Sequence, residues 1–323
     1  MSRILVTGGA GFIGYNICRI LSDDPDNSVV VADDFSRGAR DEEFRELIER
    51  ENVDLIDIDL CNRGEFEKLD DDYDMIYNLA AVVGVRNVTE NPVKTVRTNS
   101  LSVINLLDHI ADMNKKPKLL FTSSCENYAG SIKSCDVPIP TPEKVPLCIE
   151  DVFNPRWTYA SSKILGEIAC IHYSREYGFP VGIVRYHNVY GPRMGNEHVI
   201  PEFILRFREQ KDEYPLYGGY QSRSFCYVED AARMTINVMN NPQVRCDVVN
   251  VGNDRDVLVI KDLALMIMNI LGNDGSLVEE GAPDGSVSKR VPDLKRIREL
   301  GSYVYNVSME EGLQKTVEYY LNQ

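Results

Sequence analysis

The sequence predicts an α/β fold, with a doubly wound parallel sheet followed by a smaller C-terminal α/β domain. Two observations carry this prediction. Short apolar runs alternate with longer amphipathic segments through the first two-thirds of the chain, a pattern typical of parallel strands with helices on both faces. Beyond Asn188 the alternation becomes less regular, which indicates a second, smaller unit.

The individual elements follow from these runs. The first strand begins at Ile4 and breaks into glycines, and further strands are expected at 28–32, 53–59, 75–81, 119–123 and 181–185. Helices are expected at 17–21, 41–51, 99–113 and 159–177. The segment 131–155 is rich in proline and nonperiodic, so we expect a long loop over the functional site.

The domain boundary is expected near residue 186. Residues 1–186 would form a Rossmann-type domain and residues 187–323 the smaller domain. No clean linker separates them, and segments within about 225–257 are expected to return to the first domain.

Composition excludes several classes of partner. The chain has 323 residues and a formal net charge of −15, which argues against nucleic acids and anionic membranes, because both bind basic surfaces. No apolar run approaches the ~20 residues of a membrane span, and the first residues enter a strand without a signal peptide. These features predict a cytoplasmic protein.

Cysteine and histidine spacing gives no sign of a metal. The eight cysteines are scattered and contain no C-x-x-C pair, so free thiols are expected rather than disulfides or zinc ligands. The four histidines also lack metal-ligand spacing. We therefore predict no metal site.

Three spaced glycines, Gly8, Gly11 and Gly14, follow the first strand. This spacing allows a tight turn, a close approach to a pyrophosphate and close packing of a helix on a strand. Phe12 and Ile13 lie within the motif, and the helix that follows points its unpaired N–H groups at the anion. The pattern predicts a dinucleotide site.

Two carboxylates, Asp33 and Asp34, end the second apolar run, and Asp33 lies 19 residues after Gly14. This is the expected place for a carboxylate on the adenosine ribose. Such a carboxylate accepts hydrogen bonds from both ribose hydroxyls and repels a 2′-phosphate, so NAD is predicted rather than NADP. Arg37 is the residue that leaves NADP open, since a nearby arginine can accommodate that phosphate.

Tyr159 and Lys163 stand four residues apart and share one helix face. An ammonium near a phenol favours the phenolate, so Lys163 is expected to lower the pKa of Tyr159 and make it a base for a sugar hydroxyl. Ser124 ends a strand at the carboxyl edge of the sheet, where ligands bind in open α/β folds. Its hydroxyl is expected to hold the substrate oxygen.

Together these motifs make the chain resemble the extended short-chain dehydrogenases/reductases, and among them the NAD-dependent nucleotide-sugar epimerases and dehydratases. The matching segments run in the family's order and are 7–14, 78–81, 123–124, 159–163, 185–193, 223–228 and 290–293.

The resemblance implies further binding roles. The residues it places along NAD are Asp59 and Leu60 at the adenine, Leu79, Ala80, Ala81 and Asn99 along the cofactor, and Lys163 at the nicotinamide ribose. Those it places on a nucleoside-diphosphate sugar are Asn188, Arg223 and Arg290, and guanidinium groups match phosphate oxygens. It also implies a homodimer formed by the helices at 99–113 and 159–177.

The reaction implied passes through a 4-keto sugar. Glu126 stands where dehydratases and UDP-glucuronate decarboxylases of the family carry a glutamate, and it is expected to take the C5 proton. This favours 4,6-dehydration or hexuronate decarboxylation. Cys125 stands where glucose-type dehydratases carry an aspartic acid, and Pro155-Arg156-Trp157 resembles the bacterial decarboxylases. A 4-epimerase and a non-catalytic protein that binds NAD and a nucleotide sugar stay as alternatives.

Overall fold

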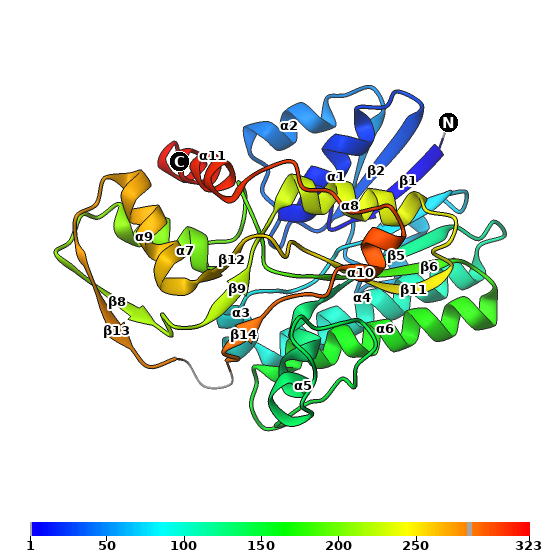
Figure 1. The fold of residues 1–323 in the computed structure, drawn as a ribbon. Helices are drawn as coiled ribbons and strands as arrows, with labels where there is room; N and C mark the ends of the chain where they lie inside the picture. Colours follow the sequence, from blue (N-terminus) through cyan, green and yellow to red (C-terminus); the bar gives the residue numbers. More distant parts are fainter. Residues whose placement is uncertain (1, 283–285) are drawn as a thin grey trace.

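A seven-stranded parallel sheet forms the centre of the protein (Figure 1). The computed structural model describes residues 2–282 and 286–323, without the side chains of Val85 and Arg86. In spatial order the strands are β11 (Cys246–Val251), β6 (Val181–Tyr186), β5 (Lys118–Ser124), β4 (Met75–Asn78), β1 (Ser2–Thr7), β2 (Asn27–Asp33) and β3 (Val53–Asp57).

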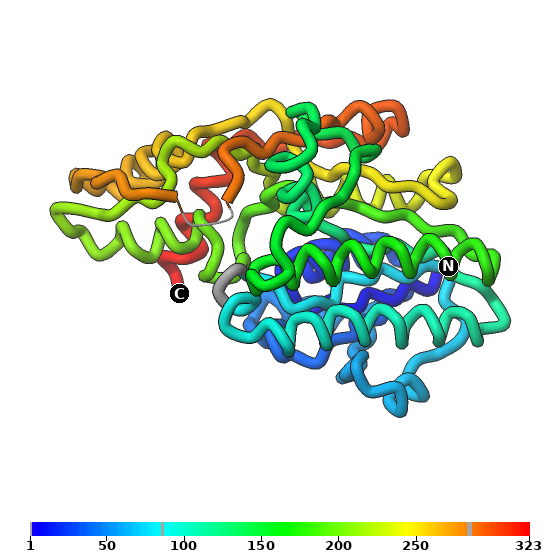
Figure 2. The backbone as a smooth tube through the Cα atoms, turned by 90° about the horizontal axis from the view of Figure 1, so that it is seen from below, coloured from blue at the N-terminus to red at the C-terminus, as the bar shows by residue number. Residues whose placement is uncertain are grey.

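Helices cover both faces of this sheet, because alternate residues of each strand point to opposite sides. Ile4 and Val6 of β1 enter one apolar cluster, whereas Leu5 enters another. Figure 2 shows the two long helices of one face side by side. That face carries α4 (Pro92–Asp112) and α6 (Trp157–Tyr177), and the opposite face carries α1 (Phe12–Ser22) and α8 (Val228–Asn240).

Shorter elements connect these layers. They are α2 (Glu42–Ile48), the 3₁₀ helix η1 (Arg63–Lys68), α3 (Val85–Glu90), the 3₁₀ helix η2 (Cys125–Tyr128), α5 (Ala129–Ser134) and α10 (Lys295–Glu299).

The C-terminal part forms a separate lobe beside the carboxyl ends of the strands (Figure 1). It contains three small sheets, β10-β7, β12-β9-β14 and β13-β8. Their strands are β7 (Val189–Tyr190), β8 (Glu213–Tyr217), β9 (Ser222–Ser224), β10 (Cys226–Tyr227), β12 (Val257–Val259), β13 (Ser276–Glu280) and β14 (Lys289–Arg290). Its helices are α7 (Val199–Phe207), α9 (Ile260–Leu271) and α11 (Met309–Leu321).

The fold class is therefore the one expected, and several boundaries differ. The first helix begins at Phe12, directly after the glycines, rather than at Ile17. The expected loop at 131–155 begins inside a helix, since α5 extends to Ser134. The strand β11, which lies beyond residue 186, pairs with β6 in the main sheet. Among the described residues, no helix has the length and apolar character needed to cross a membrane.

Candidate active site

A cavity of about 860 Å³ opens at the carboxyl ends of the central strands. Chain order reverses between β1 and β4, and this switch point is where ligands bind in open α/β sheets. Every site residue expected from the sequence lines this cavity except Asn99. One cavity therefore joins the expected dinucleotide and sugar residues.

Glycine is required in the loop after β1 and again in the first turn of α1. Gly8 has φ +70°, and a Cβ there would lie 2.7 Å from the amide nitrogen of Ala80. A Cβ on Gly14 would overlap the carbonyl oxygen of Gly8. The N-cap residue of α1, Gly11, makes no side-chain hydrogen bond to the helix. The first N–H groups of the helix therefore face the cavity, which fits a pyrophosphate.

Asp33 ends β2 at the edge of the same cavity. Its carboxylate accepts hydrogen bonds from the backbone N–H of Ala10 (3.0 Å) and of Phe35 (2.8 Å). Burial raises its pKa, and these two hydrogen bonds partly offset the rise. Asp34 and Asp59 line the cavity nearby, and each caps its own turn by accepting a backbone N–H two residues later.

The guanidinium of Arg37 binds groups of the protein itself. It donates to the carbonyl oxygen of Val83 and forms an ion pair with Glu197, at 3.3 Å between Nη2 and Oε2. The arginine therefore ties the loop after β2 to the loop after β4 and to the C-terminal lobe. Because its guanidinium is occupied, it does not counter the preference for NAD that Asp33 imposes.

Asn99 is not among the residues that line the cavity, and its side chain bonds to the protein itself. Its side chain accepts the N–H of Val82 (2.7 Å) and donates to the carbonyl oxygen of Val82 (3.1 Å) and to the Ser162 hydroxyl (3.1 Å). Asn99 thus holds the loop at 79–82 against α6, so its effect on the cavity is indirect.

Tyr159, Lys163 and Ser124 meet at the inner end of the cavity. Burial raises the pKa of Tyr159, and a hydrogen bond with Ser124 only partly offsets this rise. The expected lowering by Lys163 is therefore wrong for the free protein. Its ammonium lies 5.9 Å from the centre of the Tyr159 ring and donates to the carbonyl oxygen of Thr122 at 2.8 Å.

The buried ammonium of Lys163 is expected to reduce stability. Burial lowers its pKa from 10.5 to about 8, so the unfolded chain holds this proton more tightly and stability rises with pH between about 8 and 10.5. Replacing Lys163 with Met removes the buried charge. We expect Lys163→Met to raise the free energy of unfolding by about 2 kcal/mol at neutral pH.

Urea denaturation at several pH values measures this difference, which is expected to shrink toward alkaline pH. Lys261→Met serves as the control, because Lys261 is an exposed lysine. A Lys163→Met protein that is less stable than the parent at pH 7 would contradict the prediction.

Three arginines surround one carboxylate at the sugar end of the cavity. Arg290 binds Glu126 through two hydrogen bonds, Nη1 to Oε1 at 2.6 Å and Nη2 to Oε2 at 3.3 Å. Arg156 lies 3.8 Å from the same carboxylate. Burial alone would raise the pKa of Glu126, but the charges of Arg290 and Arg156 outweigh it and the pKa is lowered. Glu126 is therefore ionised.

Arg223 is the third member of this cluster and the register partner of Arg290 in the β9-β14 pair. It donates to the backbone oxygen of Ser222 (2.9 Å) and to the side chain of Gln221 (2.8 Å), both uncharged. Burial and the charge of Arg290 lower its pKa to about 10. A half-buried cation held by neutral groups beside a cavity fits an anionic ligand such as a diphosphate.

Two further expected residues lie beside the cluster. Asn188 has φ +39°, and its side chain donates to the carbonyl oxygen of Ser224 at 2.8 Å. Cys125 is buried, and burial raises the pKa of its thiol more than Arg290 lowers it. The thiol is therefore neutral at pH 7, which makes it a poor base.

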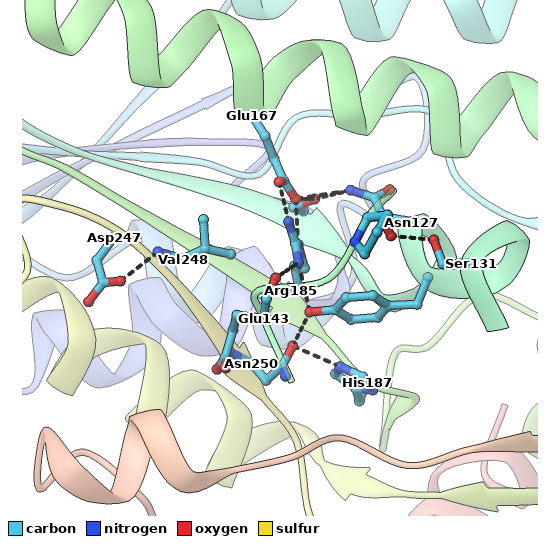
Figure 3. A network of polar contacts seen from close by, with 12 residues as sticks. Asn127, Ser131, Glu143, Glu167, Arg185, His187, Asp247, Val248 and Asn250 are labelled. Atoms are coloured by element: carbon cyan, nitrogen blue, oxygen red, sulfur yellow. Dashed lines mark hydrogen bonds and ion pairs between the residues drawn. The ribbon is translucent and has the colours of Figure 1, made fainter. Parts of the chain in front are cut away.

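Sequence reasoning missed the polar network beneath this site (Figure 3). The ion pair of Arg185 and Glu167 is 5% exposed on both sides, with Nη2 and Oε2 2.6 Å apart. Glu167 also accepts the hydroxyl of Ser123 at 2.6 Å, next to Ser124. In the sequence, Arg185 belongs to the matching segment 185–193, and Glu167 lies four residues after Lys163. Neither position marks the two residues as a buried ion pair.

Arg156 was also missed as a site residue, although the motif Pro155-Arg156-Trp157 contains it.

The described residues contain no group of three or more His, Cys, Asp or Glu side chains arranged to hold a metal.

Known proteins resemble this chain over nearly its whole length. Residues 4–252 match the sequence model of the NAD dependent epimerase/dehydratase family. A UDP-N-acetyl-alpha-D-glucosaminuronate decarboxylase of Bacillus cytotoxicus is 32% identical, over 98% of this chain and 97% of that protein. UDP-glucuronic acid decarboxylase 1 of Xenopus tropicalis is 31% identical, over 98% of this chain and 72% of that protein.

Solved structures share the whole fold. The UDP-glucose 4-epimerase of Thermotoga maritima, solved with UDP-glucose, superposes with a TM-score of 0.85 at 29% identity and covers 99% of both chains. A variant of the UDP-glucuronic acid 4-epimerase of Bacillus cereus, in complex with a fluorinated UDP-glucuronic acid and NAD, has a TM-score of 0.86 at 26% identity, again over 99% of both chains.

Proposed function

Since this chain belongs to the NAD-dependent epimerase/dehydratase family, we propose that it decarboxylates the hexuronate part of a nucleoside-diphosphate sugar through a 4-keto intermediate. The observation that carries the choice of decarboxylation is the cluster of Arg156, Arg223 and Arg290 around the single carboxylate of Glu126. This cluster has a net charge of +2 when all four groups are ionised. It supports binding of a diphosphate together with a further carboxylate.

The first step is oxidation at the sugar C4. When bound, NAD supplies the hydride acceptor. Ser124 and Tyr159 hold the C4 hydroxyl, and Tyr159 takes its proton as the carbonyl forms. When the cofactor is bound, Lys163 would donate to the nicotinamide ribose, and Asp33 would select an adenosine ribose that lacks a phosphate.

The second step loses carbon dioxide. A carboxylate on C5 lies β to the new C4 carbonyl, so its C–C bond breaks with the electron pair passing into the enolate oxygen at C4. This step needs no base at C5. Arg156 binds and orients the carboxylate, and the Tyr159 phenol, protonated in the first step, donates a hydrogen bond that stabilises the enolate. A proton from solvent then adds to C5, and return of the hydride to C4, with the Tyr159 proton going back to the C4 oxygen, would complete the reaction.

Dehydration makes demands that this site meets poorly. It requires a base for the C5 proton and an acid for the leaving C6 hydroxyl. Glu126 has a lowered pKa and is bound through both oxygens by Arg290, which weakens it as a base. Cys125 has a raised pKa, which weakens it as an acid. We therefore assign Glu126 to holding Arg290 rather than to proton abstraction.

A panel assay tests the proposal. The purified protein is incubated with UDP-, GDP-, CDP- and dTDP-linked hexuronates and hexoses, and products are followed by mass spectrometry. Loss of carbon dioxide from a hexuronate is the expected result. Loss of water from a hexose would replace decarboxylation by dehydration, and an unchanged mass with a new chromatographic peak would replace it by epimerisation.

A 4-epimerase is the second candidate, because the same pairing of Glu126 with Arg290 leaves no free base at C5. Epimerisation needs only the C4 oxidation by Tyr159, a rotation of the keto sugar and its reduction. The arginine excess near the sugar is the reason we rank it below decarboxylation.

Replacing Arg156 tests whether this arginine binds the carboxylate of the substrate. We expect Arg156→Gln to raise KM for the hexuronate about 10- to 100-fold, because a lost carboxylate contact is worth about 1.5–3 kcal/mol. Binding of the product, which lacks the carboxylate, is expected to change little. Steady-state kinetics and product titration measure both. Arg175→Gln is the control, because Arg175 is an exposed arginine in α6, the helix that begins directly after Arg156. Equal losses for substrate and product would contradict the prediction.

We also propose a homodimer that works in the cytoplasm, with residues 187–323, apart from the returning segments, binding the nucleotide sugar. Support for the dimer comes from apolar side chains on the outer faces of α4 and α6: Val93 is 75% exposed, Ile168 51% and Leu165 43%. The scattered spacing of the eight cysteines, without a C-x-x-C pair, supports a reducing compartment. Light scattering after gel filtration tests the dimer.

A further inference from the structure

The thiols of Cys135 and Cys148 lie close together in the segment between α5 and α6. Cys135 directly follows α5, and Cys148 lies in the segment that returns past this helix before α6 begins. Their sulfur atoms are 3.1 Å apart, about 1 Å more than a disulfide bond. Cys135 is exposed and Cys148 is half-buried, so reagents in solution reach the pair.

Several contacts hold Cys148 against α5. Its backbone N–H donates to the Ser131 hydroxyl at 3.2 Å, and the same hydroxyl donates to the carbonyl oxygen of Pro146. A Cβ at Gly130 would overlap the carbonyl oxygen of Cys148, so glycine allows this close approach. An ion pair between Lys133 and Glu150, 3.1 Å long, adds a further link.

A backbone hydrogen bond also fixes the position of Cys135. Its N–H donates to the carbonyl oxygen of Ser131 at 2.9 Å and closes the last turn of α5. Both sulfur atoms are thus carried by backbone that is hydrogen-bonded to the same residue. Bond formation would require only a small approach of the two side chains.

We propose that Cys135 and Cys148 form a redox-active dithiol, which a small disulfide such as glutathione disulfide converts to an intramolecular disulfide. One cysteine, as the thiolate, attacks glutathione disulfide to give a mixed disulfide and releases one glutathione thiolate, which takes up the first proton. The second cysteine then displaces the other glutathione, so two electrons and two protons pass from the protein to two reduced glutathione molecules.

The bond would close a loop that braces the active site. Within this loop, the Thr141 N–H donates to the carbonyl oxygen of Val291, and Asp293 donates back to Thr141, both at 2.9 Å. These bonds hold the chain immediately after Arg290, which binds Glu126. The disulfide would therefore restrain the loop whose backbone holds the segment directly after Arg290. This inference does not depend on the proposed reaction.

Peptide mapping tests the pair directly. The protein is equilibrated in buffers with defined ratios of reduced to oxidised glutathione, blocked with an alkylating reagent and digested with trypsin without reduction. Cleavage after Lys133, Lys144 and Arg156 places the two cysteines in separate peptides, 134–144 and 145–156. The expected result is one linked species, lighter than the two free peptides by two hydrogen atoms. Its fraction should rise with the oxidised share.

Three variants complete the test. Cys135→Ser and Cys148→Ser should each abolish the linked species and leave a mixed disulfide on the remaining cysteine. Cys246→Ser should leave it unchanged, because Cys246 is exposed and makes no sulfur contact with the described residues. The oxidised parent should melt a few degrees higher than the reduced protein, an increase that both single variants lose. Mixed disulfides without a linked species would overturn the proposal.

Discussion

Tyr159→Phe is expected to lower kcat about 1,000-fold, within the 10²- to 10⁴-fold range of positioned acid–base groups. The phenol is the group placed to take the proton of the C4 hydroxyl, and phenylalanine keeps the ring while removing that function. Bound NAD, released by denaturing the protein and measured by its absorbance, should stay at the parent level, because the glycine loop and Asp33 are untouched.

The pH dependence of kcat/KM tests the role of Tyr159 in a second way. Burial raises the pKa of Tyr159, and a base acts only after it has lost its proton. The kcat/KM of the parent should therefore still be rising at pH 9, because a phenol with a raised pKa is largely protonated there, and the residual rate of Tyr159→Phe should lack this rise. A raised pKa places the ascending limb at higher pH than an ordinary phenol would.

Tyr173→Phe is the matched control, because Tyr173 lies on the same helix and its hydroxyl donates to Asp108 at 2.7 Å. This variant should keep the parent's kcat and pH profile. Full activity in Tyr159→Phe would rule out the phenol as the proton acceptor, and loss of NAD from that variant would show that the tyrosine serves binding instead.

Arg185→Met is expected to lower the free energy of unfolding by about 3–5 kcal/mol, because it leaves the carboxylate of Glu167 buried without its cation. Arg185 donates to both oxygens of Glu167, and its third nitrogen donates to the Tyr128 hydroxyl and to the carbonyl oxygen of Glu143. Denaturant titration followed by circular dichroism measures the change.

Two comparisons isolate the buried charge. Glu167→Gln combined with Arg185→Met should recover part of the loss, because no unpaired charge is then buried. Lys315→Met breaks an exposed pair with Glu311, whose side chains are 45% and 50% exposed, and should cost less than about 1 kcal/mol. An Arg185→Met protein as stable as Lys315→Met would contradict the role given to this pair.

The network around Arg185 also shows why part of the site escaped sequence reasoning. Its members come from β5, α6, the loop after α5 and β11, and they meet only because these elements converge in three dimensions (Figure 3). No spacing along the chain marks Glu143 or Asn250 as partners. Motifs identify residues that lie close in sequence, whereas the bonds of Arg185 to Glu167, Tyr128 and Glu143 join residues 18 to 57 positions apart.

The sequence by itself determined the sheet, the dinucleotide loop and the Tyr159 and Lys163 pair. These features depend on local rules: alternation of apolar segments, glycines where a Cβ would clash, and a four-residue spacing on a helix. Such rules act within one element and its neighbour, so they are visible in the chain without tertiary contacts.

Only the tertiary structure decided the charge state and the partners of the site. It placed Glu126 against Arg290, 164 residues away, paired Arg37 with Glu197 and bonded the Asn99 side chain to the backbone of Val82. It also reversed the expected pKa shift of Tyr159, because burial dominates over a lysine 5.9 Å from the ring. The physical reason is that burial and long-range charge depend on which distant segments come together, and a linear pattern does not record this.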